Sequence, residues 1–399
     1  MTAGTVGGDL DVELTAGVTA AAGFAAAGVA AGIRSDGRED LALVVNRGPE
    51  YQAAGVFTTN RVFAAPVDWS RRALRDGRLK AVVLNSGCAN ACTGRRGRDD
   101  AAQTAAWAGE RLAATADQVA VCSTGLIGSN LPMERLRQGL DQAVAELSED
   151  GGPAAARAIL TTDTRTKQAA WRSPAGWTVG GMAKGAGMLA PGLATMLVLL
   201  TTDAVCDSTE LEPALWSAAA VSFDRLDSDG CMSTNDAVLL LASGACGIVP
   251  GRDEFERGLT AVCLSLARQL IADAEGAEHD IAITVSRAAS QEDAVEVARA
   301  VARSNLFKCA VAGRDPNWGR IMAAVGTTRA AFDPDDIDVS FNGVTVFRQG
   351  APDAPREAVD LGPRQVELVI NLRAGDEEAT VWTNDLTHGY VSENADYSS

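Results

Sequence analysis

The feature that most constrains the fold is the segment at residues 180–200, whose composition changes abruptly at Thr195. Before Thr195, residues 180–194 hold many glycines, one proline and Lys184. This composition predicts neither a continuous helix nor a continuous strand, because glycine raises the entropy cost of ordering and proline removes a hydrogen-bond donor. Residues 195–200 are β-branched or apolar, which predicts a buried strand. Thr195 is therefore expected to begin a strand directly after an irregular loop.

A threonine at this position could act as a nucleophile. Its hydroxyl is weak on its own, and one solution is for the free α-amine of the same residue to serve as the base. The pKa of an α-amine is about 7.7 to 8.0, close to the working pH and suited to proton transfer. The amine exists only after the peptide bond between Ala194 and Thr195 is cut, which an N-to-O acyl shift and hydrolysis would achieve.

Two other interpretations of this segment stay open on spacing alone. Residues 185–190 fit a G-x-G-x-x-A nucleotide loop, and Asp203 follows at a distance compatible with a ribose contact. Such a loop must open a helix, however, and Pro191 and Gly192 follow at once. The simplest alternative is that Thr195 is only the first residue of a core strand.

Motifs elsewhere in the chain favour the nucleophile. The segment from Lys184 to Leu197 resembles the self-cleaving segment of the ornithine acetyltransferases of arginine biosynthesis, the ArgJ family. Further motifs resemble this family, in family order, from near residue 17 to the last residue: Asn85–Gly87 with Asn90–Gly94, Cys122–Gly128, Thr161–Thr164, Ser233–Asp236, Asp273–Gly276, Asp315–Arg320 and Glu393–Ser399. Such coverage is more specific than any single motif.

The resemblance implies the fold and the processing of the chain. The fold class is α/β, with an αββα layering related to N-terminal nucleophile hydrolases and a smaller α+β C-terminal domain at about residues 280–399. One precursor would cut itself into an alpha chain, residues 1–194, and a beta chain, residues 195–399. The two would stay together and pair into a heterotetramer of two alpha and two beta chains.

The resemblance also implies a glutamate N-acetyltransferase that moves acetyl from N2-acetyl-L-ornithine to L-glutamate. Thr195 would attack the amide, its α-amine would take the proton, and Thr124 with Gly125 would stabilise the oxyanion. Glutamate would then resolve the acetyl-threonine ester in a ping-pong cycle. No metal or cofactor is implied, and acetyl-CoA as a second donor stays open. On spacing alone, Thr124 and Gly125 form an ordinary turn.

Further substrate contacts are implied at residues that spacing alone leaves unremarkable. Thr162 could simply cap a helix, Glu275 could be a solvated helix end, and the tail with Asn394 and Ser399 could be mobile. In the family, these residues and Thr195 contact the substrate. Lys184 could assist either self-cleavage or binding of a substrate carboxylate.

Composition narrows the function classes. A net charge of -17 argues against nucleic acid as a partner, because phosphate binding needs clustered cations. Only two histidines, His279 and His388, leave little room for a Ser-His-Asp triad, and no zinc site is completed by Cys88 and Cys92. The eight cysteines are expected to be reduced and buried in a cytoplasmic protein. The uncharged run at residues 16–33 predicts a small-residue strand and loop, not a membrane anchor.

Local patterns predict the remaining elements. A helix is expected at residues 99–114 with Asp99 and Asp100 at its start, and another is expected to use Asp315 as its cap. A hairpin turning at Asn342 and Gly343 is expected near the C-terminus. Other strands are expected at residues 41–45, 55–58, 80–84, 118–122, 167–171, 177–179, 236–241, 280–285, 365–372 and 379–383, and other helices at 70–74, 132–147, 153–159, 210–221, 253–274 and 292–302.

Two rival functions make different predictions. An aminopeptidase or amidase would use the same threonine with water as the acceptor, and would not need the contacts of Glu275 and Ser399. A ligand-binding protein with a glycine-rich phosphate loop would keep an intact chain and bind nucleotides.

Overall fold

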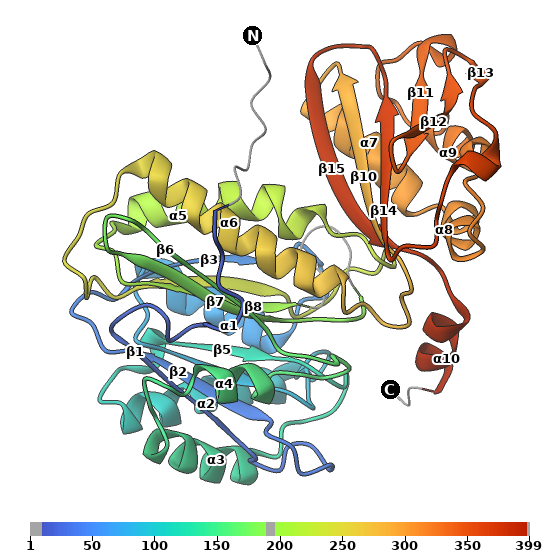
Figure 1. Ribbon diagram of the computed structural model, residues 1–399. Helices are drawn as coiled ribbons and strands as arrows, with labels where there is room; N and C mark the ends of the chain where they lie inside the picture. The colour runs from blue at the N-terminus through green and yellow to red at the C-terminus, as the bar shows by residue number, and fades with distance from the viewer. Residues whose placement is uncertain (1–9, 189–195, 397–399) are drawn as a thin grey trace.

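The computed structural model describes residues 10–188 and 196–396. Figure 1 shows two stacked sheets flanked by helices and a third sheet set beside them. The first sheet has the strand order β1-β2-β4-β5, with β4 and β5 parallel and the other neighbours antiparallel. Its strands are β1 (Phe24–Val29), β2 (Leu41–Asn46), β4 (Ala81–Asn85) and β5 (Val119–Ser123).

The second sheet has the order β3-β9-β8-β7-β6, in which β8 and β9 are parallel. Its strands are β3 (Gln52–Phe57), β6 (Lys167–Arg172), β7 (Thr178–Lys184), β8 (Leu197–Thr202) and β9 (Ala237–Ala242). Every residue of β8 and β9 is buried, because both faces of this sheet are covered. Continuous apolar runs are the expected sequence pattern for such strands.

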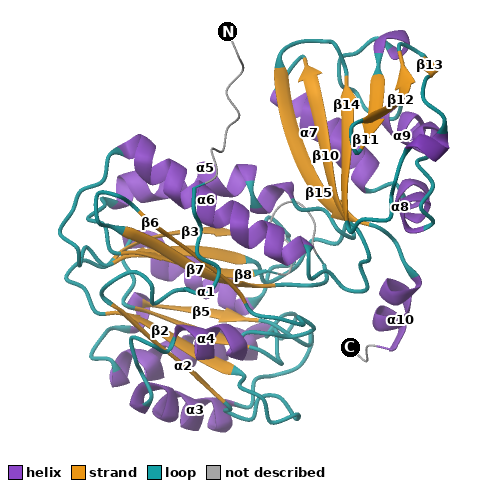
Figure 2. Ribbon diagram, viewed as in Figure 1, coloured by secondary structure: helices purple, strands orange, loops and turns teal. Residues whose placement is uncertain are grey.

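Side-chain alternation along the strands builds the layers. In the first sheet Val44 and Val82 pack toward Leu199 and Leu239 of the second sheet, whereas Leu43 and Val83 pack on the opposite face. Helices α2 (Gly94–Arg111) and α3 (Met133–Ala145) cover that outer face, and α5 (Ser208–Val221) and α6 (Arg252–Ile271) cover the outer face of the second sheet. The result is the αββα layering that the family resemblance implied (Figure 2).

Two shorter helices pack against the edge strands of the first sheet. Helix α1 (Ala65–Ala73) contacts β5, and α4 (Gly152–Ala158) contacts β1. Short 3-10 turns complete the connections: η1 (Leu74–Asp76), η2 (Ala116–Gln118), η3 (Phe223–Arg225), η4 (Pro334–Asp336) and η5 (Arg356–Ala358).

The third sheet has its own apolar core and the strand order β13-β12-β11-β14-β10-β15. Helices α7 (Gln291–Ala302), α8 (Asn305–Ala312) and α9 (Trp318–Val325) pack with it, and α10 (His388–Asp396) follows the last strand. The predicted hairpin is confirmed, with Asn342 and Gly343 both at positive φ. The strands are β10 (Asp280–Ala288), β11 (Asp338–Phe341), β12 (Val344–Arg348), β13 (Ala351–Pro352), β14 (Gln365–Asn371) and β15 (Glu377–Asn384).

The glycines at the start of the segment at residues 180–194 lie inside a strand. The prediction that the strand ends at residue 179 and that an irregular loop begins at Gly180 is therefore wrong. Strand β7 runs through Gly180 and Gly181 as far as Lys184. A Cβ on Gly180 would lie 2.3 Å from the backbone oxygen of Gly17, and one on Gly181 would lie 2.7 Å from Leu200 Cδ2. These glycines therefore allow close packing of neighbours that are distant in sequence.

Three predicted helix starts are also wrong. Helix α1 begins at Ala65, five residues before the predicted start at residue 70. Helix α2 begins at Gly94, so Asp99 and Asp100 lie beyond its first turn. Helix α9 begins at Trp318 and is capped by Asn317, whose side chain accepts a hydrogen bond from the Arg320 N–H at 3.2 Å. Asp315 instead accepts a hydrogen bond from the Asn317 side chain at 2.8 Å, so it supports the cap rather than forming it.

The cysteines and the uncharged run at residues 16–33 were also the subject of predictions from the sequence. All eight cysteines are free, but Cys246 is only half-buried and Cys92, Cys231 and Cys309 are exposed, so the expectation that all are buried is wrong for these four. The run at residues 16–33 forms β1 and its flanking loops, as predicted. Within residues 10–188 and 196–396, no helix is long and apolar enough to cross a membrane, and no three His, Cys, Asp or Glu side chains gather as metal ligands would.

Candidate active site

The end of strand β5 presents Thr124 and Gly125. The Thr124 N–H donates to the Asn85 carbonyl at 2.9 Å, and its side chain is buried. Gly125 has a φ of 125°, and a Cβ there would lie 2.4 Å from the carbonyl carbon of Gly87. Only glycine fits this turn, because L residues rarely adopt this φ and the facing backbone leaves no space.

Lys184 reaches Thr124 from the other sheet. It is the last residue of β7, and its fully buried Nζ lies 3.2 Å from Thr124 Oγ1 and 2.7 Å from Thr161 Oγ1. Burial lowers the pKa of Lys184, and the nearby carboxylate of Asp163 offsets part of that effect. The two stacked sheets thus join a cation to the predicted oxyanion residue.

Buried carboxylates hold this lysine in place. Asp163 Oδ1 lies 2.6 Å from Lys167 Nζ and accepts the Gly185 N–H at 2.6 Å, while its Oδ2 lies 3.8 Å from Lys184 Nζ. Lys167 also pairs with Asp273 at 2.6 Å. Burial alone would raise the pKa of Asp163, but Lys184 and Lys167 outweigh burial and hold it well below its usual value.

Sequence reasoning missed these carboxylates and Lys167 as parts of the site. Asp163 and Asp273 are separated along the chain by over a hundred residues, so their meeting at Lys167 depends on tertiary structure. One signal was available: Lys167 begins an apolar strand, and a lysine buried there requires a paired carboxylate.

Asp236 lies beside the point where the chain re-enters the described residues. The Met196 N–H donates to Asp236 Oδ1 at 3.0 Å, and Asp236 is fully buried. Its second oxygen, Oδ2, has no hydrogen-bond partner among the described residues. Burial raises the pKa of Asp236 well above its usual value, and the Met196 N–H offsets only part of that rise. The motif Ser233–Asp236 contains this residue, but the sequence alone did not indicate that its carboxylate belongs to the site.

Glu275 and Asn394 form a second contact at the site. The Asn394 side chain donates to Glu275 Oε2 at 3.0 Å, and the Glu275 N–H donates to the Ala186 carbonyl at 3.0 Å. A Cβ on Gly187 would lie 2.5 Å from Glu275 Oε2, so the loop that follows Lys184 packs closely on this carboxylate. Glu275 also lines a cavity of about 190 Å³ together with Asp229, Lys308 and Tyr390.

The remaining predicted residues are Thr162 and three residues that the structure does not describe. Thr162 is exposed, whereas its neighbour Thr161 contacts Lys184. Ala194, Thr195 and Ser399 lie outside the described residues. The structure therefore brings Thr124, Gly125 and Lys184 together, and it joins Asn394 of α10 to Glu275, which packs on the loop after Lys184.

The nucleotide-loop interpretation has no structural support. The buried carboxylate of Asp203 accepts the N–H groups of Ala22 at 2.9 Å and Thr178 at 2.7 Å, so it serves the fold rather than a ribose. Residues 186–188, inside the candidate loop, form a bend rather than the first turn of a helix.

Two sheets between helix layers, with a buried lysine, threonine and carboxylates at the strand ends, define an α/β protein with αββα layering. The chain belongs to the ArgJ family, whose family model matches residues 25–399. The predicted family, fold class and assignment as an enzyme are therefore confirmed.

Relatives from several bacteria match most of the chain. An arginine biosynthesis bifunctional protein ArgJ from Streptomyces avermitilis is 59% identical over 367 residues, covering 92% of this chain and 96% of its own length. The protein of the same name from Thermobifida fusca is 58% identical with the same coverage. An ornithine acetyltransferase structure from Mycobacterium tuberculosis, complexed with ornithine, is 56% identical and covers 45% of this chain and 98% of its own, with a TM-score of 0.45.

Proposed function

We propose that this chain is a glutamate N-acetyltransferase that transfers acetyl from N2-acetyl-L-ornithine to L-glutamate, releasing L-ornithine and N-acetyl-L-glutamate. The observation that carries the proposal is the contact of Lys184 with Thr124 beside the strand that follows Thr195. Lys184 pairs with Leu197 across β7 and β8, and Leu197 is only two residues after Thr195. Two residues span at most about 7 Å, so the proposed nucleophile belongs to this neighbourhood.

The chemistry begins with a cut between Ala194 and Thr195, which leaves Thr195 with a free α-amine. In the first half-reaction the Thr195 hydroxyl attacks the acetyl carbonyl and the α-amine accepts its proton. That proton passes to the departing nitrogen, ornithine leaves, and an acetyl ester stays on Thr195. In the second half-reaction the amine of glutamate attacks the ester, and the threonine hydroxyl is restored.

Thr124 and Gly125 are proposed to stabilise the oxyanion. As an ammonium group, Lys184 only donates hydrogen bonds, so Thr124 Oγ1 accepts in that contact. The Thr124 hydroxyl proton has no acceptor among the described residues and is available to a substrate oxygen. The Gly125 N–H would supply the second donor. One such donor is worth roughly 100-fold to 1000-fold in rate.

Glu275 and Asn394 support recognition of the ornithine part. Asn394 donates a hydrogen bond to Glu275, and Glu275 packs against the loop after Lys184. The adjoining cavity of about 190 Å³ is lined by both Glu275 and Asp229. Paired carboxylates suit the side-chain ammonium group of ornithine. Thr162 and Ser399 are proposed as further substrate contacts, and Asp236 as a positioning residue that fixes the Met196 N–H next to the nucleophile.

The proposal is tested by incubating the purified protein with N2-acetyl-L-ornithine, with and without L-glutamate, and quantifying products by mass spectrometry. We expect ornithine and N-acetylglutamate in equal amounts, and little acetate without glutamate. Acetate release that does not depend on glutamate would instead identify an amidase or aminopeptidase. A parallel reaction with acetyl-CoA determines whether it also serves as a donor.

The assembly and location follow from the same proposal. The alpha chain, residues 1–194, and the beta chain, residues 195–399, would form a cytoplasmic heterotetramer, with residues 280–399 as a C-terminal domain of the beta chain. Native mass spectrometry should detect two copies of each chain. A particle with one uncut chain per subunit would contradict this assembly.

A further inference from the structure

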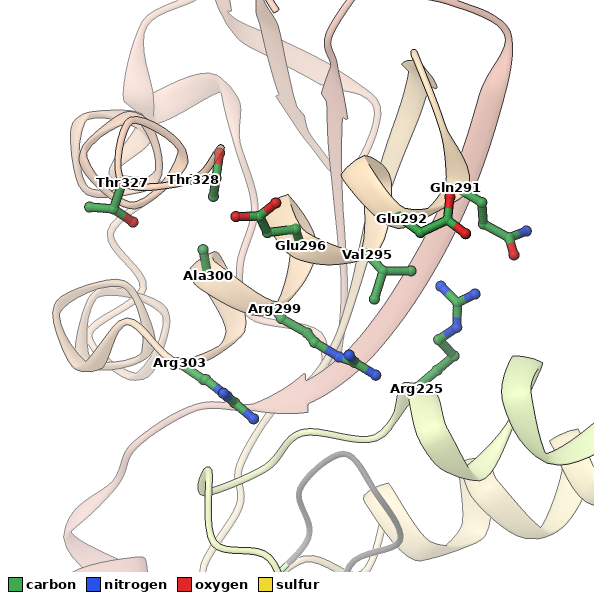
Figure 3. A pocket seen from close by; sticks show the side chains of 10 residues that line it. All are labelled: Arg225, Gln291, Glu292, Val295, Glu296, Arg299, Ala300, Arg303, Thr327 and Thr328. Carbon is green, nitrogen blue, oxygen red and sulfur yellow. The ribbon is translucent and has the colours of Figure 1, made fainter. Parts of the chain in front are cut away.

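Three arginines line a different pocket, and of these Arg225 is buried, Arg299 is half-buried and Arg303 is exposed. This pocket, of about 530 Å³, lies between η3 and α7 and contains Arg225, Arg299 and Arg303 (Figure 3). Arg303 also borders the smaller cavity that contains Glu275, so the two cavities share one wall residue. None of the predicted catalytic residues lines the larger pocket.

Arg225 is the most enclosed of these cations, with 8% of its surface exposed. Its Nε donates to the Ala220 carbonyl at 2.9 Å, which fixes the side chain at the end of α5. Its buried Nη1 has no hydrogen-bond partner among the described residues. In Figure 3 its guanidinium group points into the pocket toward α7. A buried donor without a partner destabilises the protein, because it has lost its hydrogen bond to water and gained none in return.

Arg299 repeats this arrangement from the facing helix. Its Nη2 donates to the Asp224 carbonyl at 2.8 Å, while its buried Nε has no partner in the described part of the chain. Burial lowers the pKa of both Arg225 and Arg299, and for Arg225 the neighbouring Arg299 adds to that effect. Arg303 differs from both, because its Nε pairs with Asp227 at 2.7 Å.

Among the described residues, no acidic side chain around the pocket forms a hydrogen bond with Arg225 Nη1 or Arg299 Nε. The Asp224 carboxylate offsets part of the lowering for both arginines. Glu296 accepts the Arg329 N–H at 2.9 Å, and Glu292 is exposed. Two guanidinium donors, Arg225 Nη1 and Arg299 Nε, therefore have no partner in the described residues. The net charge of the chain is -17, so the chain as a whole does not attract polyanions, and a general affinity for polyanions does not explain these two arginines.

We propose that this pocket binds a small oxyanion, a carboxylate or a phosphate group, between Arg225 and Arg299. Guanidinium groups present planar forks that match both kinds of oxyanion with two parallel hydrogen bonds. The bound group would satisfy Arg225 Nη1 and Arg299 Nε and reduce the repulsion between the two cations. Arg303 lines both cavities, so a ligand bound in the larger pocket would lie in a cavity that shares this residue with the cavity that contains Glu275.

The test titrates inorganic phosphate and, separately, acetate into the full protein at constant ionic strength maintained with chloride. Calorimetry and thermal unfolding should both show saturable binding. Arg225→Lys and Arg299→Lys keep the charge but remove the fork, and each should weaken binding by about tenfold or more. Arg95→Lys, at a side chain that is 89% exposed, is the matched control and should bind as the wild type does.

The outcomes separate the two ligand chemistries and the two proposals. Stronger binding of phosphate identifies a phosphate site, and stronger binding of acetate identifies a carboxylate site. Chloride giving the same stabilisation, or equal binding by the Arg225→Lys and Arg299→Lys variants, overturns the proposal. The assay needs no substrate, so a protein that binds the anion without transferring acetyl refutes only the proposed function.

Discussion

Two groups of cations in this protein differ in how their hydrogen-bond donors are paired. Lys167 and Lys184 extend from neighbouring strands of one sheet onto Asp163, and Lys167 also reaches Asp273. Arg225 and Arg299 face each other from a 3-10 turn and a helix, and each keeps a buried donor without a partner in the described residues. Charges that the chain pairs internally position one another, whereas unmatched donors indicate a ligand from outside the chain.

The largest effect is expected from breaking the paired group. Asp163→Ala leaves Lys167 with Asp273 as its only carboxylate partner and leaves the buried charge of Lys184 uncompensated, which costs about 3–5 kcal/mol in free energy of unfolding. Urea denaturation measures this loss. Glu149→Ala is the control, because it removes an exposed pair with Arg47 and should cost less than about 1 kcal/mol. Equal losses in the two variants would show that the buried group is not coupled as described.

A second variant tests whether the paired group also serves the chemistry. Thr124→Val keeps the shape of the side chain but removes the hydroxyl, so kcat for acetyl transfer should fall roughly 100-fold to 1000-fold. Steady-state kinetics measure this change, and Thr124→Ser should recover most of the rate because it restores the hydroxyl. Wild-type kcat in Thr124→Val would remove Thr124 from the proposed oxyanion site.

The pH dependence of stability sharpens the comparison further. Because the pKa of Asp163 lies below its usual value, its stabilisation is fully present above the pKa of an unfolded aspartate, about 4, and is lost as pH falls through the lower folded-state value. The stability difference between wild type and Asp163→Asn should therefore stay constant from about pH 8 to pH 5 and shrink below about pH 4. A difference that already shrinks between pH 7 and pH 5 would contradict the assigned direction.

The smallest effect is expected in the unmatched group. Arg225→Met removes one of two repelling cations together with an unpaired buried donor, so without added anion the free energy of unfolding should change by less than about 1 kcal/mol. The same urea experiment measures it. A loss as large as that of Asp163→Ala would mean that Arg225 is paired within the protein.

Local sequence signals predicted the elements whose cause is local. The hairpin at Asn342 and Gly343 follows from a turn that needs positive φ, and the buried strand after Thr195 follows from its apolar run. The cap of α9 was misplaced because Asp315 and Asn317 are both good caps, and only the geometry shows which one accepts the Arg320 N–H.

Features that depend on distant contacts could not be predicted from the sequence. Strand β7 needs glycine at Gly180 and Gly181 because Gly17 and Leu200 approach too closely to leave room for a Cβ. The network around Asp163 needs three segments to meet, and no local pattern encodes that meeting. The resemblance to the family supplied Thr124, Gly125, Lys184, Glu275 and Asn394, but it did not reveal which carboxylates position Lys184.

The central claim is that the chain cuts itself to free the amine of Thr195, and the intact mass of the purified protein under denaturing conditions tests it most directly. The wild type should give two fragments that meet between Ala194 and Thr195, and Thr195→Ala should give one uncut chain. Adding N2-acetyl-L-ornithine should add the mass of one acetyl group to the fragment that begins at Thr195. A single uncut wild-type chain would contradict the proposed nucleophile and return Thr195 to the role of a core strand residue.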